Sequence, residues 1–304
     1  MLSNLSPVTS NLALGRTSRI RGYVDLMKLR VVELLLVTTL PALVLASEGI
    51  PPFWVSIATI FGGTLAAGSA NAFNMIVESE SDKLMSRTAK RPLVTGVLSK
   101  TQAKIFASVI GALSLIIFWV FTTPLATACT LFAISFYVLV YTMALKRRTR
   151  QNIVWGGIAG CMPVFIGWAA ITNSLSWSAL AFFMVIFFWT PPHFWSLAIK
   201  YRDDYAAAGI PMLPVVAPKS RVRTEMWFHT VAMIICSLAV IQLAHLPIWS
   251  LVVTALLGII FGYQLLQLRD SSDSYMKMAG KIFHGSISYL SLYSILLVVA
   301  QLVK

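Results

Sequence analysis

Charged residues and cysteines are scarce in this sequence of 304 residues. Only 12% of the residues are charged, against roughly 25% in soluble globular domains, and 58% are hydrophobic. With a mean hydropathy of +0.79, this composition excludes an ordinary soluble protein and predicts an integral membrane protein. The cysteines, Cys129, Cys161 and Cys236, lie in apolar runs without metal-ligand spacing, so we expect neither a disulfide framework nor a zinc site.

Long apolar stretches are what the sequence has instead, and each approaches the ~20 residues that span a bilayer. There are nine of them, at about residues 32–49, 53–76, 103–122, 125–145, 153–172, 178–199, 226–245, 248–267 and 282–302. The sequence therefore predicts an all-α membrane protein with one transmembrane domain of nine helices, residues 23–304. Residues 1–22 are polar and free of acidic side chains, and we expect a disordered cytoplasmic tail there, with a transit peptide as the alternative.

Lysine and arginine concentrate in the N-terminal tail and in the links after the second, fourth, sixth and eighth apolar stretches. The alternate links contain neither. By the positive-inside rule, the charged segments face the cytoplasm and the C-terminus lies outside the cell membrane. This topology accounts for the net charge of +13, so we expect no nucleic-acid partner.

A first acidic cluster follows the second apolar stretch. Asn74, Glu78 and Asp82 are spaced four residues apart, so a helix that continues past the membrane surface places them on one face, with Glu80 pointing elsewhere. The same link supplies three cations, Arg87, Lys90 and Arg91. Hard oxygen ligands beside cations suit Mg²⁺ with a polyphosphate. The alternative is a solvated helix end whose acids balance nearby lysines.

A second acidic cluster, Asp203 and Asp204, follows the sixth stretch beside Lys200 and Arg202. An even number of crossings separates the two clusters, so both are predicted to emerge on the same membrane side. Together they are expected to hold Mg²⁺ on an isoprenyl diphosphate, while cations neutralise the leaving group and the apolar interior holds the isoprenoid. A transporter is a rival interpretation because broken helices and buried polar residues also mark transport sites. An oxidase-assembly scaffold is another.

Pro191, Pro192 and His193 lie inside the sixth stretch, in the block WTPPHFW. Prolines free backbone carbonyls within a helix, and a polar side chain at that depth is a candidate functional residue. A histidine bonded to one freed carbonyl is the alternative.

These motifs resemble a known family. The pattern N-x-x-x-E-x-x-x-D after the second helix, the second acidic motif and the nine helices are similar to the UbiA superfamily of intramembrane prenyltransferases. Within it, the block FFWTPPHFWSLAIKYRDDYAAAGIPMLPVV resembles the protohaem IX farnesyltransferase (haem O synthase) branch. The resemblance covers about residues 25–290. Glu78 and Glu80 depart from the usual Asp, which affects metal geometry, and Leu29 replaces a common Pro.

The resemblance implies a UbiA-like bundle around a central apolar cavity that opens toward the cytoplasm. It implies Mg²⁺-dependent transfer of farnesyl from farnesyl diphosphate to a vinyl group of haem B, with water addition, giving haem O and pyrophosphate for terminal oxidase biogenesis. The implied metal ligands are Asn74, Glu78, Asp82, Asp203 and Asp204. The implied diphosphate-binding residues are Arg87, Lys90, Arg91, Lys146 and Lys200.

His193 is the implied haem contact, through the iron or a propionate. The expected surroundings are membrane lipid, with haem A synthase or oxidase assembly factors as further partners. An aromatic or quinone precursor is the alternative prenyl acceptor.

Overall fold

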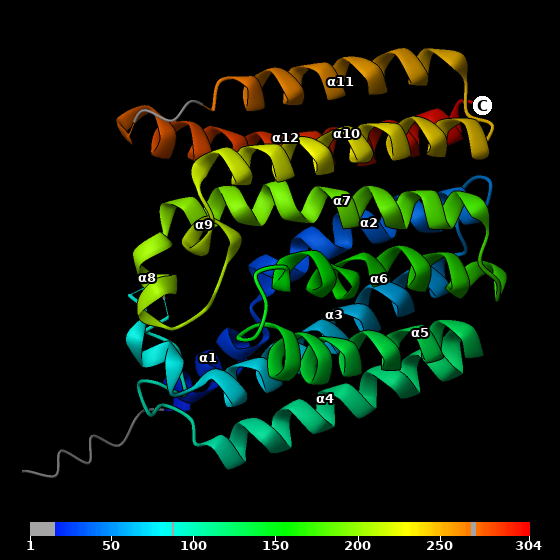
Figure 1. The fold of residues 1–304 in the computed structure, drawn as a ribbon. Helices are drawn as coiled ribbons and strands as arrows, with labels where there is room; N and C mark the ends of the chain where they lie inside the picture. The colour runs from blue at the N-terminus through cyan, green and yellow to red at the C-terminus, as the bar shows by residue number, and fades with distance from the viewer. Residues whose placement is uncertain (1–15, 87, 269–271) are drawn as a thin grey trace, which may run out of the picture.

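The computed structural model describes residues 16–86, 88–268 and 272–304, with side chains throughout except at residues 16, 17, 30, 31, 34, 35, 272 and 273. Every regular element in these segments is a helix. Figure 1 shows the long helices running side by side, from α4 and α5 at one edge of the bundle to α11 at the other. The all-α prediction is confirmed.

The described residues contain nine long helical segments that coincide with the nine predicted stretches. They are α2 (Leu29–Ala46), α3 (Phe53–Glu78), α4 (Lys100–Phe121), α5 (Pro124–Ser135) with its continuation η2 (Phe136–Leu145), α6 (Asn152–Thr172), α7 (Trp177–Lys200), α10 (Lys219–Leu243), α11 (Ile248–Leu266) and α12 (Ser272–Leu302). All except α2 are long and apolar enough to cross a membrane. In α2 the described apolar stretch is the shorter Leu36–Ala46.

Shorter elements precede and link these helices. They are α1 (Arg16–Met27), the 3₁₀ helix η1 (Ser81–Leu84), α8 (Arg202–Ala207) and α9 (Leu213–Val216). Within the expected tail of residues 1–22, residues 16–22 are therefore helical, whereas residues 1–15 lie outside the described segments.

Several long helices begin at residues whose side chains satisfy free backbone N–H groups. Ser99 and Gln102 form a reciprocal capping box at the start of α4, and Thr123 and Ser176 cap α5 and α7. Helix α7 runs without interruption through Pro191 and Pro192. It packs against α6, α10 and α12 and contributes the fully buried Phe182 and Trp195 to the core.

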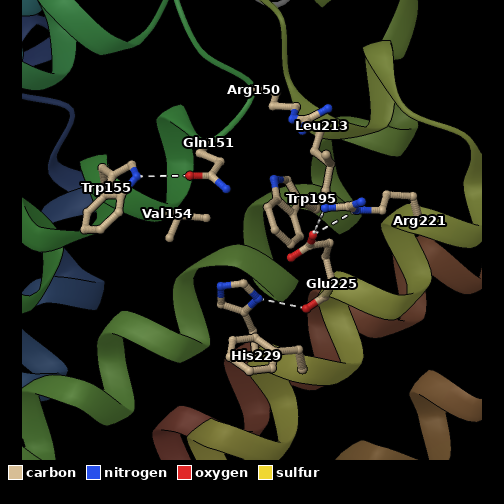
Figure 2. Close-up of a pocket in the computed structure, with 10 residues that line it drawn as sticks. Arg150, Gln151, Val154, Trp155, Trp195, Leu213, Arg221, Glu225 and His229 are labelled. Carbon is tan, nitrogen blue, oxygen red and sulfur yellow. Dashed lines mark hydrogen bonds and ion pairs between the residues drawn. The ribbon is translucent and has the colours of Figure 1, made fainter.

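The charged links gather at one end of the bundle. In Figure 1, α1, η1, α8 and α9 all lie at the left end, whereas the C-terminus and the uncharged links lie at the right. The segregation read from the sequence is therefore present in the fold. A cavity of about 190 Å³ also opens at the charged end, between α6, α7, α9 and α10 (Figure 2).

Candidate active site

Two asparagines on the last turns of α3 join three other elements. Asn71 donates its amide to the carbonyl oxygen of Met27 at 3.0 Å, at the end of α1. Asn74 accepts from the Lys28 ammonium at 2.9 Å and donates to the Thr142 hydroxyl at 3.2 Å. The end of α3 is thus fixed between the α1–α2 junction and η2.

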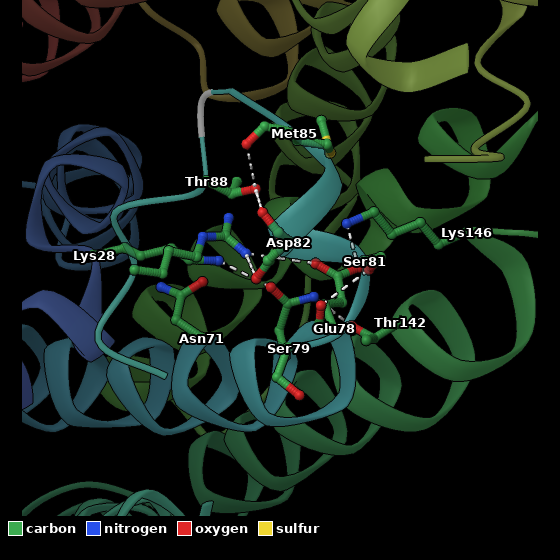
Figure 3. Close-up of polar contacts among 12 residues, drawn as sticks. Lys28, Asn71, Glu78, Ser79, Ser81, Asp82, Met85, Thr88, Thr142 and Lys146 are labelled. Atoms are coloured by element: carbon green, nitrogen blue, oxygen red, sulfur yellow. Dashed lines mark hydrogen bonds and ion pairs between the residues drawn. The ribbon is translucent and has the colours of Figure 1, made fainter. Parts of the chain in front are cut away.

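Glu78 and Asp82 are buried, with 5% and 3% of their surface exposed. Glu78 accepts from the Lys146 ammonium and Asp82 accepts from Arg91. The same Arg91 nitrogen, Nη1, lies 3.8 Å from Glu78 Oε2. Figure 3 shows Glu78, Asp82 and Lys146 converging where α3 ends. Burial of these charges is tolerable because each has an opposite partner.

The sequence predicted that one α-helix carries Asn74, Glu78 and Asp82 on the same face. This prediction is wrong for Asp82. Helix α3 ends at Glu78, and Asp82 lies in the tighter turn η1. The Thr88 hydroxyl donates to the Asp82 carbonyl oxygen at 2.8 Å and holds this turn against the following loop. Arg91 reaches Asp82 from that loop, so the oxygen atoms still meet although the α-helix does not continue.

Glu80 points away from this cluster, as the sequence predicted. It is exposed and accepts from Lys83 at 2.7 Å and from Lys100 at 3.2 Å. The hydrogen bond from Lys83, with that from Lys100, lowers the pKa of Glu80. The side chains of Glu78 and Glu80 therefore differ in burial and in partners although only one residue separates them.

The lysines of the cluster have perturbed acidities. Burial, and next the nearby Arg91 charge, lower the pKa of Lys28 to about 7. Burial also lowers the pKa of Lys146, although the Glu78 carboxylate opposes that shift. Both ammonium groups are therefore held in surroundings that favour an added anion, because an anion would offset their lost hydration.

Lys146 reaches the cluster from the end of the fourth span, where helix α5 continues as the π-helix η2. The Lys146 backbone N–H donates to the Tyr141 carbonyl oxygen at 2.9 Å, five residues back, and the Thr142 hydroxyl donates to the Tyr137 carbonyl oxygen at 2.8 Å. Asn152 at the start of α6 donates to the Lys146 carbonyl oxygen at 2.9 Å. Turns of this wide type recur at functional sites.

The second acidic cluster lies at the same end of the bundle and touches the loop that follows η1. Asp204 on α8 is half-buried and accepts from the Ser86 hydroxyl at 2.6 Å. Asp203 is exposed. Within the described residues, no three His, Cys, Asp or Glu side chains gather closely enough to form a ready metal site. The two acidic clusters are thus connected through Ser86, without a shared point of coordination.

The remaining predicted residues are placed less centrally. Lys90 and Lys200 are exposed, and the Lys200 ammonium lies 5.5 Å from the centre of the Tyr201 ring. Arg87 lies outside the described residues.

His193 is buried within α7, stacked between Trp189 and Phe283 with ring centroids 4.2 and 4.6 Å away. Its Nδ1 lies 2.8 Å from the Ser286 hydroxyl. The alternative prediction was a bond from His193 to a backbone carbonyl freed by the prolines. At Nδ1 the ring contacts the Ser286 hydroxyl instead.

The sequence matches the UbiA prenyltransferase family over residues 35–287. The chain belongs to the UbiA prenyltransferase family. Among its relatives, the protoheme IX farnesyltransferase of Renibacterium salmoninarum is 49% identical over 94% of this chain and 91% of its own length. That of Leifsonia xyli subsp. xyli is 46% identical over 92% and 91%.

Two solved structures share the UbiA fold with this chain. A digeranylgeranylglyceryl phosphate synthase superposes with a TM-score of 0.78 at 17% identity, covering 94% of this chain and 99% of that one. A UbiA homolog from Archaeoglobus fulgidus bound to DMAPP and Mg²⁺ gives a TM-score of 0.67 at 18% identity, over 91% and 99%. At these identities the likeness establishes the fold of this UbiA chain.

Three residues of this UbiA site were missed by the sequence reasoning: Lys28, Thr142 and Ser86. Lys28 lies directly before an apolar stretch, where a cation is ordinarily read as a topology signal. Thr142 and Ser86 are hydroxyls without a spacing pattern. No local signal marks any of the three, because their partners are 46, 68 and 118 residues away along the chain.

Proposed function

We propose that this chain transfers a farnesyl group from farnesyl diphosphate to a vinyl group of haem B, with addition of water, and releases haem O and pyrophosphate. The observation that carries the proposal is the buried cluster of Glu78 and Asp82 with Lys28, Arg91 and Lys146 at the end of an apolar bundle. Relatives named protoheme IX farnesyltransferase that cover nearly the whole chain support the choice of both substrates.

Mg²⁺ fits the donor set of this cluster. The Arg91 guanidinium already bridges Glu78 and Asp82, so there is room for a cation between the two carboxylates. Together with Asn74 these two carboxylates would hold the metal, and Asp203 and Asp204 would meet the metal–diphosphate complex from the second acidic cluster. Bound there, Mg²⁺ would take up negative charge on the diphosphate.

The cations of the cluster have a second use in this reaction. Arg91 and Lys146 pair with carboxylates in this structure, and Lys28 pairs with the Asn74 oxygen. When a diphosphate enters, their N–H groups can turn to its oxygens and stabilise the charge that develops as the carbon–oxygen bond breaks. Lys90 and Lys200 are the outer cations that we propose to draw the anion in, and Arg87 keeps the diphosphate-binding role that the sequence predicts.

Breaking that bond leaves an allylic cation on the farnesyl chain, and the bonding electrons depart with pyrophosphate. The π electrons of the haem vinyl group then form the new carbon–carbon bond. Water adds to the resulting cation beside the porphyrin and loses a proton, which gives the hydroxyethylfarnesyl group. The apolar interior keeps bulk water away from the first cation.

His193 is the residue that we propose to contact haem. Its ring is held flat between two aromatic rings, and the Ser286 contact at Nδ1 leaves Nε2 for another partner. Imidazole nitrogen is a common haem-iron ligand.

The end of the bundle that contains the proposed active site is proposed to face the cytoplasm, and the C-terminus is proposed to lie outside the plasma membrane. Farnesyl diphosphate would then reach the cluster from the cytoplasmic side. Haem A synthase or oxidase assembly factors are the proposed consumers of the product.

The test is haem analysis in cells that lack their own haem O synthase. Expression of the wild-type chain should restore haem O, and Asp82→Asn should lower its rate of formation by on the order of 100-fold, because a buried charge that organises the leaving group is lost. Glu80→Gln is the matched control, since Glu80 is exposed and its ion pairs within the described residues are with Lys83 and Lys100. Equal haem O from wild type and Asp82→Asn, or a prenylated aromatic acid as the only product, would contradict the proposal.

A further inference from the structure

The cavity between α6, α7, α9 and α10 is separate from the Glu78 cluster. It has a volume of about 190 Å³, and none of the residues around it belongs to the proposed active site. It lies at the charged end of the bundle, near the expected level of the lipid head groups. A volume of that size exceeds the ~30 Å³ of one water several-fold, yet falls below the ~300 Å³ of a pocket for a whole drug-sized ligand.

The cavity contains an unsatisfied buried donor. Trp195 is 1% exposed, and its indole N–H has no hydrogen-bond partner among the described residues. In Figure 2 the indole nitrogen lies on the side of the ring that faces Gln151. Buried polar groups are nearly always paired, so an orphan N–H in the wall of a cavity points to an acceptor that binds there.

Neighbouring groups extend this donor set. The Gln151 side-chain oxygen accepts from Trp155 at 3.1 Å, which leaves the Gln151 amide N–H groups as donors. His229 donates its Nδ1 hydrogen to the Glu225 carbonyl oxygen at 2.8 Å, so a neutral His229 ring adds no further donor. Arg150 and Arg221 add two positive charges.

Glu225 offsets part of this charge. Its Oε1 accepts from Arg221 Nε at 2.9 Å and from Nη2 at 2.8 Å. A guanidinium has five N–H donors, so Arg221 keeps further donors, and within the described residues Arg150 forms no ion pair with that carboxylate. Two arginines against one glutamate leave the wall of the cavity cationic.

The mouth of the cavity is aromatic. Trp155 and Phe228 stand beside it with 49% and 62% of their surface exposed. Exposed aromatic side chains beside arginine at the end of a membrane-spanning helix are typical of the membrane interface. An occupant therefore has an oxyanion that fits inside and an apolar body that remains in the lipid.

We infer that this cavity is a binding site for the oxyanion of a membrane-resident amphiphile, held by Trp195 and Gln151 with charge from Arg150 and Arg221. The phosphate of an anionic phospholipid fits this description, since basic pockets between membrane helices hold such head groups. A haem propionate has the same chemistry, and that second source alone rests on the proposed function. The residues that line the cavity are not those of the Glu78 cluster.

The test measures binding without farnesyl diphosphate, so its outcome does not depend on farnesyl transfer. The purified full chain in neutral detergent is titrated with phosphatidylglycerol, phosphatidylcholine, haem and haem dimethyl ester, which lacks the free carboxylates. Native mass spectrometry follows the lipids and absorbance follows haem. The wild type should bind phosphatidylglycerol more tightly than phosphatidylcholine, or haem more tightly than its dimethyl ester. The pair that shows the preference identifies the source of the oxyanion.

Arg221→Gln should weaken that preferred ligand about tenfold, because a charge-assisted hydrogen bond is lost. Trp195→Phe keeps an aromatic ring but removes the N–H, and should weaken it about fivefold. Arg148→Gln is the control, since Arg148 is exposed, lies two residues before Arg150 and does not line the cavity. Thermal unfolding of each variant verifies the fold. The inference is overturned if the wild type binds both members of each probe pair equally. It is also overturned if Arg221→Gln and Trp195→Phe bind the preferred ligand as tightly as the wild type does.

Discussion

Glu78 and Lys146 form a buried ion pair across 68 residues of sequence, with only 6% and 16% of their side chains exposed. A pair of this kind adds little stability by itself, because both ions lose hydration when they are buried. Removal of one partner is different, since it leaves the other charge buried without compensation. The pair thus makes the end of α3 dependent on the position of η2.

Lys146→Met should lower the free energy of unfolding by roughly 3–5 kcal/mol, because it removes the nearest charge partner of the buried Glu78 carboxylate. The double variant Lys146→Met with Glu78→Gln should recover part of that loss, because no uncompensated charge remains. Reversible unfolding in mixed detergent micelles measures both. Lys83→Met, which removes a partner of the exposed Glu80, is the control and should leave stability unchanged. Equal losses in the single and double variants would argue against a coupled pair.

Lys28 gives the stability a pH dependence. Burial and Arg91 lower its pKa to about 7 in the folded chain, against 10.5 for a free lysine. Between about pH 7 and pH 10 the unfolded chain therefore binds more protons than the folded chain, so the free energy of unfolding rises with pH. Below pH 7 both states carry the proton and this contribution is constant.

We expect the melting temperature of the wild type to rise relative to that of Lys28→Met between about pH 7 and pH 9, and the difference to be flat below about pH 6. Thermal unfolding in detergent across this range measures it. A difference that does not change with pH would show that Lys28 keeps its ordinary pKa in the folded chain, and a difference that falls as pH rises would contradict a lowered pKa.

Helices α6 and η2 pack closely at one glycine. A Cβ atom at Gly156 would collide with the ring of Tyr141, whereas a Cβ at Gly160 would meet nothing within 4 Å. Both glycines lie on α6, so the contrast isolates the contact between the two elements. Small residues favour close helix contact in membrane proteins. Which glycine faces η2 depends on how the two helices are rotated.

Gly156→Ala should lower the free energy of unfolding by about 1–3 kcal/mol through overpacking, and should reduce haem O formation because η2 carries Lys146. Gly160→Ala should change neither. Unfolding in detergent and haem extraction measure the two effects. If both variants behave alike, the close approach of α6 and η2 has no part in placing Lys146.

The molecule as a whole separates its charged links from its uncharged links, and the two acidic clusters share one end. This arrangement follows from an even number of helices between them. It predicts the orientation in the membrane, since loops rich in Lys and Arg remain in the cytoplasm.

A reporter enzyme that is active only outside the cytoplasm should be active when fused after Lys304 and inactive when fused within residues 147–150. Fusion within residues 173–176, a link without Lys or Arg, should restore activity and serves as the control. The reverse pattern would place the proposed active site on the outer face and would contradict entry of farnesyl diphosphate from the cytoplasm.

The sequence by itself determined the helices, their order and the end of the bundle at which charge gathers. Apolar length and the alternation of charged links are local properties that each segment carries wherever it packs. It also indicated that Asn74 and Glu78 share one helix face, because they lie four residues apart on α3.

Only the tertiary structure decided which cations meet those oxygens. Lys28, Arg91 and Lys146 come from three different elements, and the sequence offered many other exposed lysines and arginines as equal candidates. The end of α3 at Glu78, the π-helix before Lys146 and the orphan N–H of Trp195 were likewise decided by packing. The physical reason is that burial and pairing of charge depend on which helices become neighbours, and neither leaves a pattern within one segment of sequence.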